Sequence, residues 1–88
     1  MQPNETNEAE LLALRALGTA LEEKRLADRF LSLTGLIPPE LRQRAGEARL
    51  LAAFLRFLEA HEPDLLAVAG QMGVAPGDLV IARRALEQ

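Results

Sequence analysis

Apolar residues recur every three or four positions along the 88-residue chain rather than at alternate ones, a pattern that predicts helices. The first apolar stripe consists of Leu11, Leu14, Leu17 and Leu21, widened by Leu12, Ala13, Ala16 and Ala20. Asn7 and Glu10 have the spacing of a capping box, in which each side chain bonds a free backbone N–H of the first turn. We therefore predict a first helix that begins at Asn7, preceded by a flexible tail over residues 1–6.

Glycine and proline residues mark the boundaries of the later helices. Gly35 and Gly73 are predicted to end helices in the left-handed conformation, which glycine adopts without steric cost. Pro is tolerated in a first helical turn because the N–H that it lacks would have been unpaired there. After a polar break at residues 22–25, the predicted helices cover about 26–34, 39–45, 47–60, 63–72 and 76–88.

The helix over residues 47–60 carries the run "LLAAFLRFL", which is apolar on nearly every side and therefore predicts a buried central helix. Its expected core residues are Leu51, Phe54, Leu55, Phe57 and Leu58, packed with Leu14, Leu17 and Phe30 from the first two helices. The apolar face of the second helix is predicted to consist of Leu26, Phe30 and Leu33. The predicted fold class is all-α. It is a compact bundle of five to six short helices around that central helix, in a single domain over residues 7–88.

An internal similarity raises the possibility of two tandem three-helix units. "GLIPPEL" from Gly35 and "GVAPGDL" from Gly73 share one form at an offset of 38 residues, and "AELLA" and "ARLLA" repeat upstream at an offset of 39. Convergence is the alternative, because Gly at a helix end and Pro at a helix start arise independently for physical reasons.

Composition supports helices and excludes several classes of protein. Leu and Ala supply 33 of the 43 apolar residues, whereas the β-branched Val and Ile that favour strands number five, so we expect no sheet. The chain has no Cys, hence no disulfide or thiolate. Its N-terminus is acidic, unlike a secretory signal, and no apolar run approaches the roughly 20 residues of a membrane span. We predict a cytoplasmic protein without contact to a membrane.

Charge is unevenly distributed, with net values of −4 over residues 1–23, +3 over 24–49 and −2 over 50–88. The basic middle third could bind an acidic partner surface or a phosphate-bearing ligand. The favoured interpretation is that its bases pair in water with acids of the first helix, where each pair contributes about 0–1 kcal/mol. The candidate partner-binding residues are Arg25, Arg29, Arg42, Arg44, Arg49 and, from the central helix, Arg56.

Arg56 is the one charge within "LLAAFLRFL", and an unpaired buried cation would cost several kcal/mol. It is therefore expected to reach solvent or to meet an acid, with Glu59 at i+3 and Asp64 as the nearest candidates. Emergence on an apolar rim would instead mark the edge of a binding face.

Catalytic and metal-binding chemistry have few candidate residues. Ser32 and His61 are the single Ser and His, and Tyr and Trp are absent, so nucleophile and base arrangements lack members. Glu59, His61, Glu62 and Asp64 match no metal-site template, because three carboxylates beside one imidazole suit no particular ion. We predict no enzyme activity, no cofactor and no metal.

Residues 65–86 have the form of a DNA-binding helix-turn-helix, with Ala69 as the small residue where two helices cross and Gly73 at the turn. However, the end of the second helix that would read bases holds Pro76, Gly77 and Asp78, and the chain has a net charge of −3. These features disfavour nucleic acid as a partner and favour a structural turn.

Five runs together resemble a family of small bacterial all-helical proteins known only as a domain of unknown function: "RFLSLTGL", "PPELR", "LLAAFLRFL", "EPDLL" and "AP" followed by "ARRAL". The resemblance spans about residues 9–86. It implies a helical fold in the bacterial cytoplasm and transfers no catalytic residue. The sequence departs from the family pattern at Glu23–Lys24, in place of Asp-Pro, at Ile37, in place of a capping Ser, and at Arg56, in place of Asp.

Two functions from different classes remain. The first is a non-enzymatic protein–protein interaction module whose partner is another protein or a second copy of the chain. The alternative is a small helix-turn-helix DNA-binding regulator that uses residues 65–86.

Overall fold

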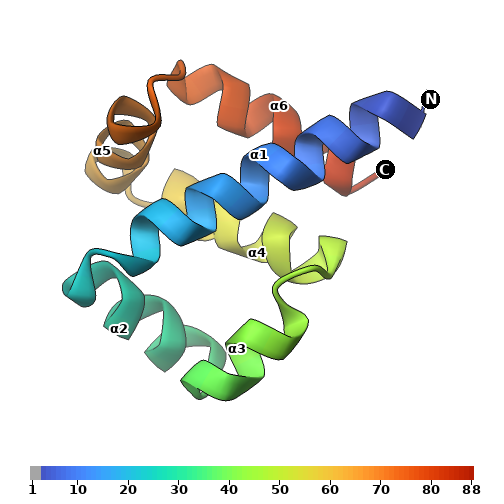
Figure 1. Cartoon of the computed structure of the whole chain (residues 1–88). Coiled ribbons are helices and arrows are strands. Elements are labelled where there is room, and N and C mark those ends of the chain that lie inside the picture. Colours follow the sequence, from blue (N-terminus) through green and yellow to red (C-terminus); the bar gives the residue numbers. More distant parts are fainter. Residues whose placement is uncertain (1–2) are drawn as a thin grey trace.

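The computed structural model describes residues 3–88, with side chains from residue 6 onward, and it contains six helices and no strand in that range. The helices are α1 (Pro3–Leu21), α2 (Lys24–Thr34), α3 (Pro38–Arg44), α4 (Ala48–Glu59), α5 (Glu62–Met72) and α6 (Pro76–Leu86). In Figure 1, α1 crosses in front of α4, with α5 and α6 above it and α2 and α3 below. The predicted all-α bundle is confirmed.

Helix α4 is the central element of the bundle, as its apolar sequence predicts. It packs against α1, α5 and α6. Its buried residues are Leu50, Leu51, Ala52, Phe54, Leu55 and Leu58. Phe54 makes an edge-to-face contact with Phe30 of α2, with ring centroids 5.2 Å apart. Phe57, which we expected to be buried, is only partly so, because one side of its ring faces an open groove beside α2.

The orientation of α1 differs from the prediction. Of the leucine stripe only Leu17 is buried, whereas Leu11, Leu14 and Leu21 are exposed by 61, 44 and 37%. The buried face is instead lined with alanine at positions 9, 13, 16 and 20. Small side chains let α1 lie close to α4, α5 and α6, and close approach buries backbone and β-carbons that bulky leucines would hold apart.

Two further details of the first two helices were predicted incorrectly. Helix α1 begins at Pro3 rather than at Asn7, so residues 3–6 belong to the helix and not to a tail. Pro3 suits this start because proline is favoured in a first helical turn. The other part of the predicted tail, residues 1–2, lies outside the described residues. Leu33 is 70% exposed because the last turn of α2 borders the same open groove as Phe57.

Two turns of the chain share one construction, which confirms the predicted left-handed glycines. Gly35 after α2 and Gly73 after α5 both have φ of 75°. The N-cap N–H of the following helix then donates to an acid three residues on, from Ile37 to Glu40 (3.0 Å) and from Ala75 to Asp78 (3.1 Å). The two halves nevertheless differ in packing, because α6 packs against both α1 and α4 while α3 packs only lightly. A true duplication stays a prediction.

Replacing Gly73 with Ala is expected to lower the free energy of unfolding by about 1 kcal/mol or more, because the added Cβ is strained at positive φ. Gly70 is the matched control, since it lies in the regular part of α5 with open space around it. Gly70→Ala should raise the free energy of unfolding by about 0.5–1 kcal/mol. Urea unfolding followed by circular dichroism measures both, and changes of equal sign would contradict the left-handed assignment.

Candidate functional site

The six arginines predicted to bind a partner do not form one surface. Arg25 and Arg29 of α2 border the groove beside the α4–α5 turn. Arg42 of α3 lies on another side of α2, in a groove with Leu21 and Leu31. Arg44 and Arg49 flank the turn between α3 and α4, and Arg56 lies toward the C-terminal end of α4. Binding by these residues stays a prediction.

The groove beside α2 contains a compact polar cluster. The guanidinium of Arg29 lies over the ring of Phe57, 5.3 Å from its centroid, and donates a 2.7 Å hydrogen bond to Asp64. Nδ1 of His61 lies 2.8 Å from the same carboxylate oxygen. Partial burial raises the pKa of Asp64, but the hydrogen bonds with Arg29 and His61 outweigh it, so the pKa lies below its ordinary value of 3.8. The cluster fastens α2 to the start of α5.

Ser32 and His61, far apart in the sequence, border this same groove. The pairing of His61 with Asp64 has the form of the base and its orienting acid in a hydrolase. However, among the described side chains no hydrogen bond joins Ser32 to His61, so the hydroxyl is not held for deprotonation. Sequence reasoning missed this juxtaposition because the fold, not the spacing, brings α2 to the α4–α5 turn.

The bases of the middle third pair differently from the favoured interpretation. Lys24 pairs with Asp28 within α2, Arg29 with Asp64 of α5, and Arg44 with Glu47 across one turn. None of the ion pairs among side chains 6–88 joins a middle-third base to an acid of α1. The reason is their placement: Glu8 of α1 borders the groove against α6, whereas the bases lie on α2, on α3 and, for Arg49, at the start of α4.

Arg56 pairs with neither predicted acid but with Glu87, which caps the C-terminus of α6. Its Nη2 donates to Oε1 of Glu87 at 3.0 Å. Glu87 also accepts a 2.7 Å bond from Arg83, and Arg83 donates to Glu59 at 3.1 Å. The bond from Arg56 lowers the pKa of Glu87, and the bond to Glu59 raises the pKa of Arg83. This four-residue network ties α6 to α4.

The acids and the histidine that the sequence analysis disfavoured as a metal site are divided between these two networks. Glu59 bonds Arg83, whereas Asp64 bonds Arg29 and His61. Over the part of the chain that the structure describes, no three His, Asp or Glu side chains gather as a metal site would require.

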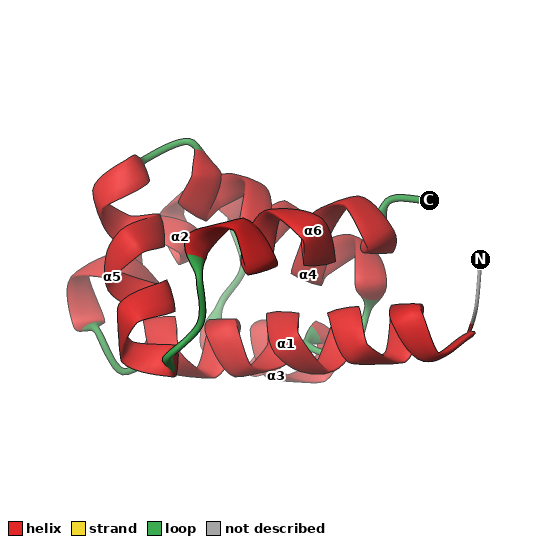
Figure 2. Cartoon of the chain, turned by 90° about the horizontal axis from the view of Figure 1, so that it is seen from above, coloured by secondary structure: helices red, strands yellow, loops and turns green. Residues whose placement is uncertain are grey.

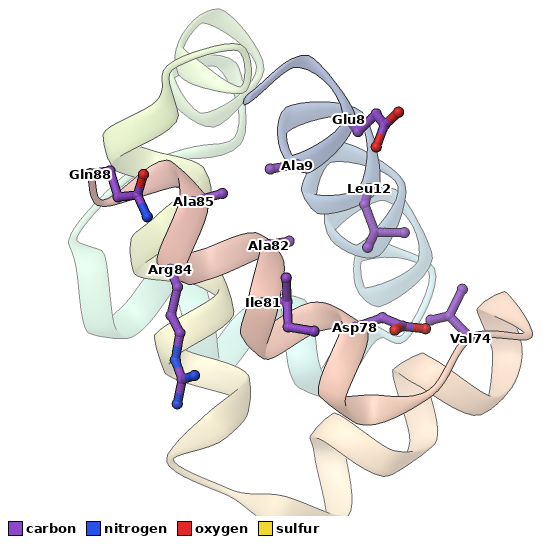
Figure 3. Close-up of a pocket in the computed structure, with 10 residues that line it drawn as sticks. All are labelled: Glu8, Ala9, Leu12, Val74, Asp78, Ile81, Ala82, Arg84, Ala85 and Gln88. Atoms are coloured by element: carbon purple, nitrogen blue, oxygen red, sulfur yellow. The ribbon is translucent and has the colours of Figure 1, made fainter. Parts of the chain in front are cut away.

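A second groove lies between α1 and α6, and sequence reasoning did not identify it. Its volume is about 540 Å³, enough for several apolar side chains. Figure 3 shows Glu8 and Leu12 on its α1 side, Ile81 and Asp78 on its α6 side, and small alanines between them. The lining residues are Glu8, Ala9, Leu12, Val74, Asp78, Ile81, Ala82, Arg84, Ala85 and Gln88.

The groove is apolar in its floor and acidic along part of its rim. Ala9 and Ala82 are buried, whereas Ile81 is 64% exposed although it is a large apolar residue. Asp78 already bonds the N-cap N–H of α6, and Glu8 forms no ion pair with the side chains described. The groove exists because alanines at the α1–α6 contact leave space that larger residues would fill. These alanines are also the signal in the sequence from which the groove could have been predicted.

Helices α5 and α6 do form a helix-turn-helix. The three-residue turn Gly73–Ala75 redirects the chain by 101°, and Ala69 and Leu79 are fully buried beside it. However, α6 packs against α1 and α4, and Arg83 is engaged by Glu59 and Glu87, so Arg84 is the one arginine of α6 without an ion pair among the described side chains.

No helix within residues 3–88 is by itself long and apolar enough to cross a membrane. Helices α5 and α6 reach that length only together, and the 101° turn separates them.

A family model described as "Protein of unknown function (DUF3572)" matches residues 6–88. The match confirms the resemblance to a family of unknown function. No curated protein and no solved structure matches the chain.

Proposed function

We propose that the chain, which belongs to the DUF3572 family of proteins of unknown function, is a non-catalytic interaction module that binds a segment of another protein. The observation that carries this proposal is the open apolar groove between α1 and α6, with Ile81 projecting beside its alanine floor. An uncovered large apolar side chain next to a hollow is typical of helix-in-groove recognition.

The chemistry of the groove defines the segment that it binds. The alanine floor favours apolar side chains of an amphipathic helix or extended strand, because burying them removes both apolar surfaces from water. Glu8 has no ion pair among the described side chains, and with Asp78 it favours a Lys or Arg on the flank of that segment. The proposed partner is thus a segment with an apolar face and a basic edge.

Site-specific photo-crosslinking tests this proposal. A photoreactive amino acid at Ile81, 64% exposed in the groove, should capture one segment with an apolar face and a basic edge, identified by mass spectrometry. The same group at Ile37, 57% exposed elsewhere, is the matched control and should not capture it. With the purified partner, Ile81→Asp should weaken binding about ten-fold or more, as loss of a central apolar anchor does. Equal capture at both positions, or unchanged binding by Ile81→Asp, would contradict the proposal.

The helix-turn-helix geometry of α5 and α6 supports DNA binding as a second candidate. Against it stand the acid at the N-terminal end of α6 and the burial of that helix in the bundle. Fluorescence anisotropy with random-sequence duplex DNA distinguishes the two. Binding at low salt that Arg84→Glu abolishes would favour DNA, whereas its absence would leave protein binding as the function.

We also propose a cytoplasmic location. It is supported by the absence of cysteine from the sequence, which is typical of proteins in a reducing compartment. The bacterial origin implied by the family resemblance stays a prediction.

A further inference from the structure

The outward face of α1 is an apolar stripe that the described residues leave exposed. Leu11, Leu14, Gly18 and Leu21 follow one another at intervals of three, four and three residues, so they lie on one side of the helix. The three leucines are exposed by 61, 44 and 37%. In Figure 1 no other helix lies in front of α1, and in Figure 2 it runs along one side of the molecule.

Gly18 stands in the middle of this face without an internal reason for being glycine. It lies in the regular part of α1, where Gly is less favourable than Ala, and its φ is not positive. A Cβ added there would meet no atom within 4 Å. An exposed interior glycine flanked by leucines lets a second helix approach the backbone closely.

Opposite charges lie along one edge of the same face. Arg15 of α1 is three residues before Gly18, and Glu22, the first residue of the turn that follows α1, is four residues after it; both are exposed. Neither forms an ion pair with the side chains that the structure describes, and Arg15 has no acid three or four residues away on its helix. The opposite edge carries Leu14, four residues before Gly18, and Leu21, three after it.

We propose that this face binds a second copy of the chain, with the two α1 helices antiparallel about a twofold axis at Gly18. In such a pair, a residue a few positions before Gly18 in one chain faces a residue about as many positions after Gly18 in the second chain. The two residues lie on the same edge of the helix. Leu14 then packs against Leu21 of the second copy. Arg15 meets Glu22 of the second copy, and the symmetry repeats both contacts.

The antiparallel direction follows from the two edges. A parallel pair would bring the edge with Arg15 and Glu22 against the edge with Leu14 and Leu21, and so would set charges on leucines. In the antiparallel pair, the acidic N-terminal half of each α1 also extends past the α1–α2 turn of the second copy. There it approaches Lys24 and Arg25 of that copy. The opposite charges of the first and middle thirds, which do not pair within one chain, thus face each other between two chains.

This self-association goes beyond the proposed groove, because it uses a different set of α1 residues. The groove is lined by Glu8, Ala9 and Leu12, none of which belongs to the stripe through Gly18.

A charge exchange tests the antiparallel pair by sedimentation velocity over roughly micromolar to millimolar concentrations of the full chain. The wild type should become dimeric as concentration rises. Arg15→Glu alone and Glu22→Arg alone each create two like-charge contacts, and each should weaken the dimer about ten-fold or more. The double variant should restore it. A wild type that stays monomeric throughout, or a double variant no better than the single ones, would overturn the proposal.

Gly18→Gln distinguishes an effect on dimerisation from an effect on the stability of the monomer. The added side chain has open space in one chain, so the melting temperature at low concentration should rise, while close approach of two helices is blocked and the dimer weakens. Gain of stability with unchanged dimerisation would overturn the role of Gly18. Ile81→Asp should leave the dimer intact, so failure of the groove and failure of this surface are distinguishable.

Discussion

Phe54→Ala is expected to lower the free energy of unfolding by about 3–5 kcal/mol, the largest loss of any single truncation considered. Phe54 is 1% exposed and makes an edge-to-face contact with Phe30, whose ring also contacts Phe57 at 5.2 Å. Removal of its ring deletes apolar contacts and leaves a cavity that helices α2 and α4 cannot close without moving. Urea unfolding followed by circular dichroism at 222 nm measures the loss.

Two controls keep this result interpretable. Phe57→Ala should lose less because that ring is only partly buried, and Leu33→Ala should be close to neutral because Leu33 is 70% exposed. A native domain is stable by only about 5–15 kcal/mol, so Phe54→Ala could unfold outright. Phe54→Leu, which keeps most of the volume, should then fold with an intermediate loss. Equal stability of Phe54→Ala and the wild type would contradict the central position of α4 in the bundle.

Most boundaries of the later helices could be predicted because they are local, whereas the start of α1 at Pro3 was predicted incorrectly. Gly35 and Gly73 end helices through their own backbone conformation, and Pro38 and Pro76 begin helices through the N–H that they lack. The central position of α4 could also be predicted, because a helix that is apolar on most sides has to be buried.

The orientation of α1 could not be read from hydrophobicity. Leu11, Leu14 and Leu21 form one stripe and the alanines form another on the opposite side of the helix, and each has helical spacing. Hydrophobicity favours burying leucine, but close packing of α1 against α4, α5 and α6 favours alanine, and only the tertiary structure shows which effect decides.

The partners of charged residues escaped prediction for a related reason. Arg56 meets Glu87, which is 31 residues away, whereas the sequence offered Glu59 and Asp64 close by. Those two acids are occupied by Arg83 and Arg29, from helices that the fold brings together. The groove between α1 and α6 also depends on this packing. The candidate sites could therefore not be predicted from the spacing of their residues in the sequence, because the tertiary structure brings those residues together.

Ala16→Leu is expected to lower the free energy of unfolding by about 1–3 kcal/mol, although it replaces one apolar residue with a larger one. Ala16 is completely buried on the face of α1 that packs against the rest of the bundle. Added methyl groups must displace the helix or force neighbouring side chains out of their preferred rotamers. The matched control is Leu14→Ala on the exposed face of α1, with the free energy of unfolding measured at a concentration too low for self-association. It should cost well under the roughly 2–5 kcal/mol of a core Leu→Ala change, because Leu14 is 44% exposed. The leucine stripe predicted from the sequence requires the reverse: a large loss from Leu14→Ala and a near-neutral Ala16→Leu. Measuring the two variants side by side therefore determines which face of α1 is buried, and the reverse order would place the alanine face in solvent.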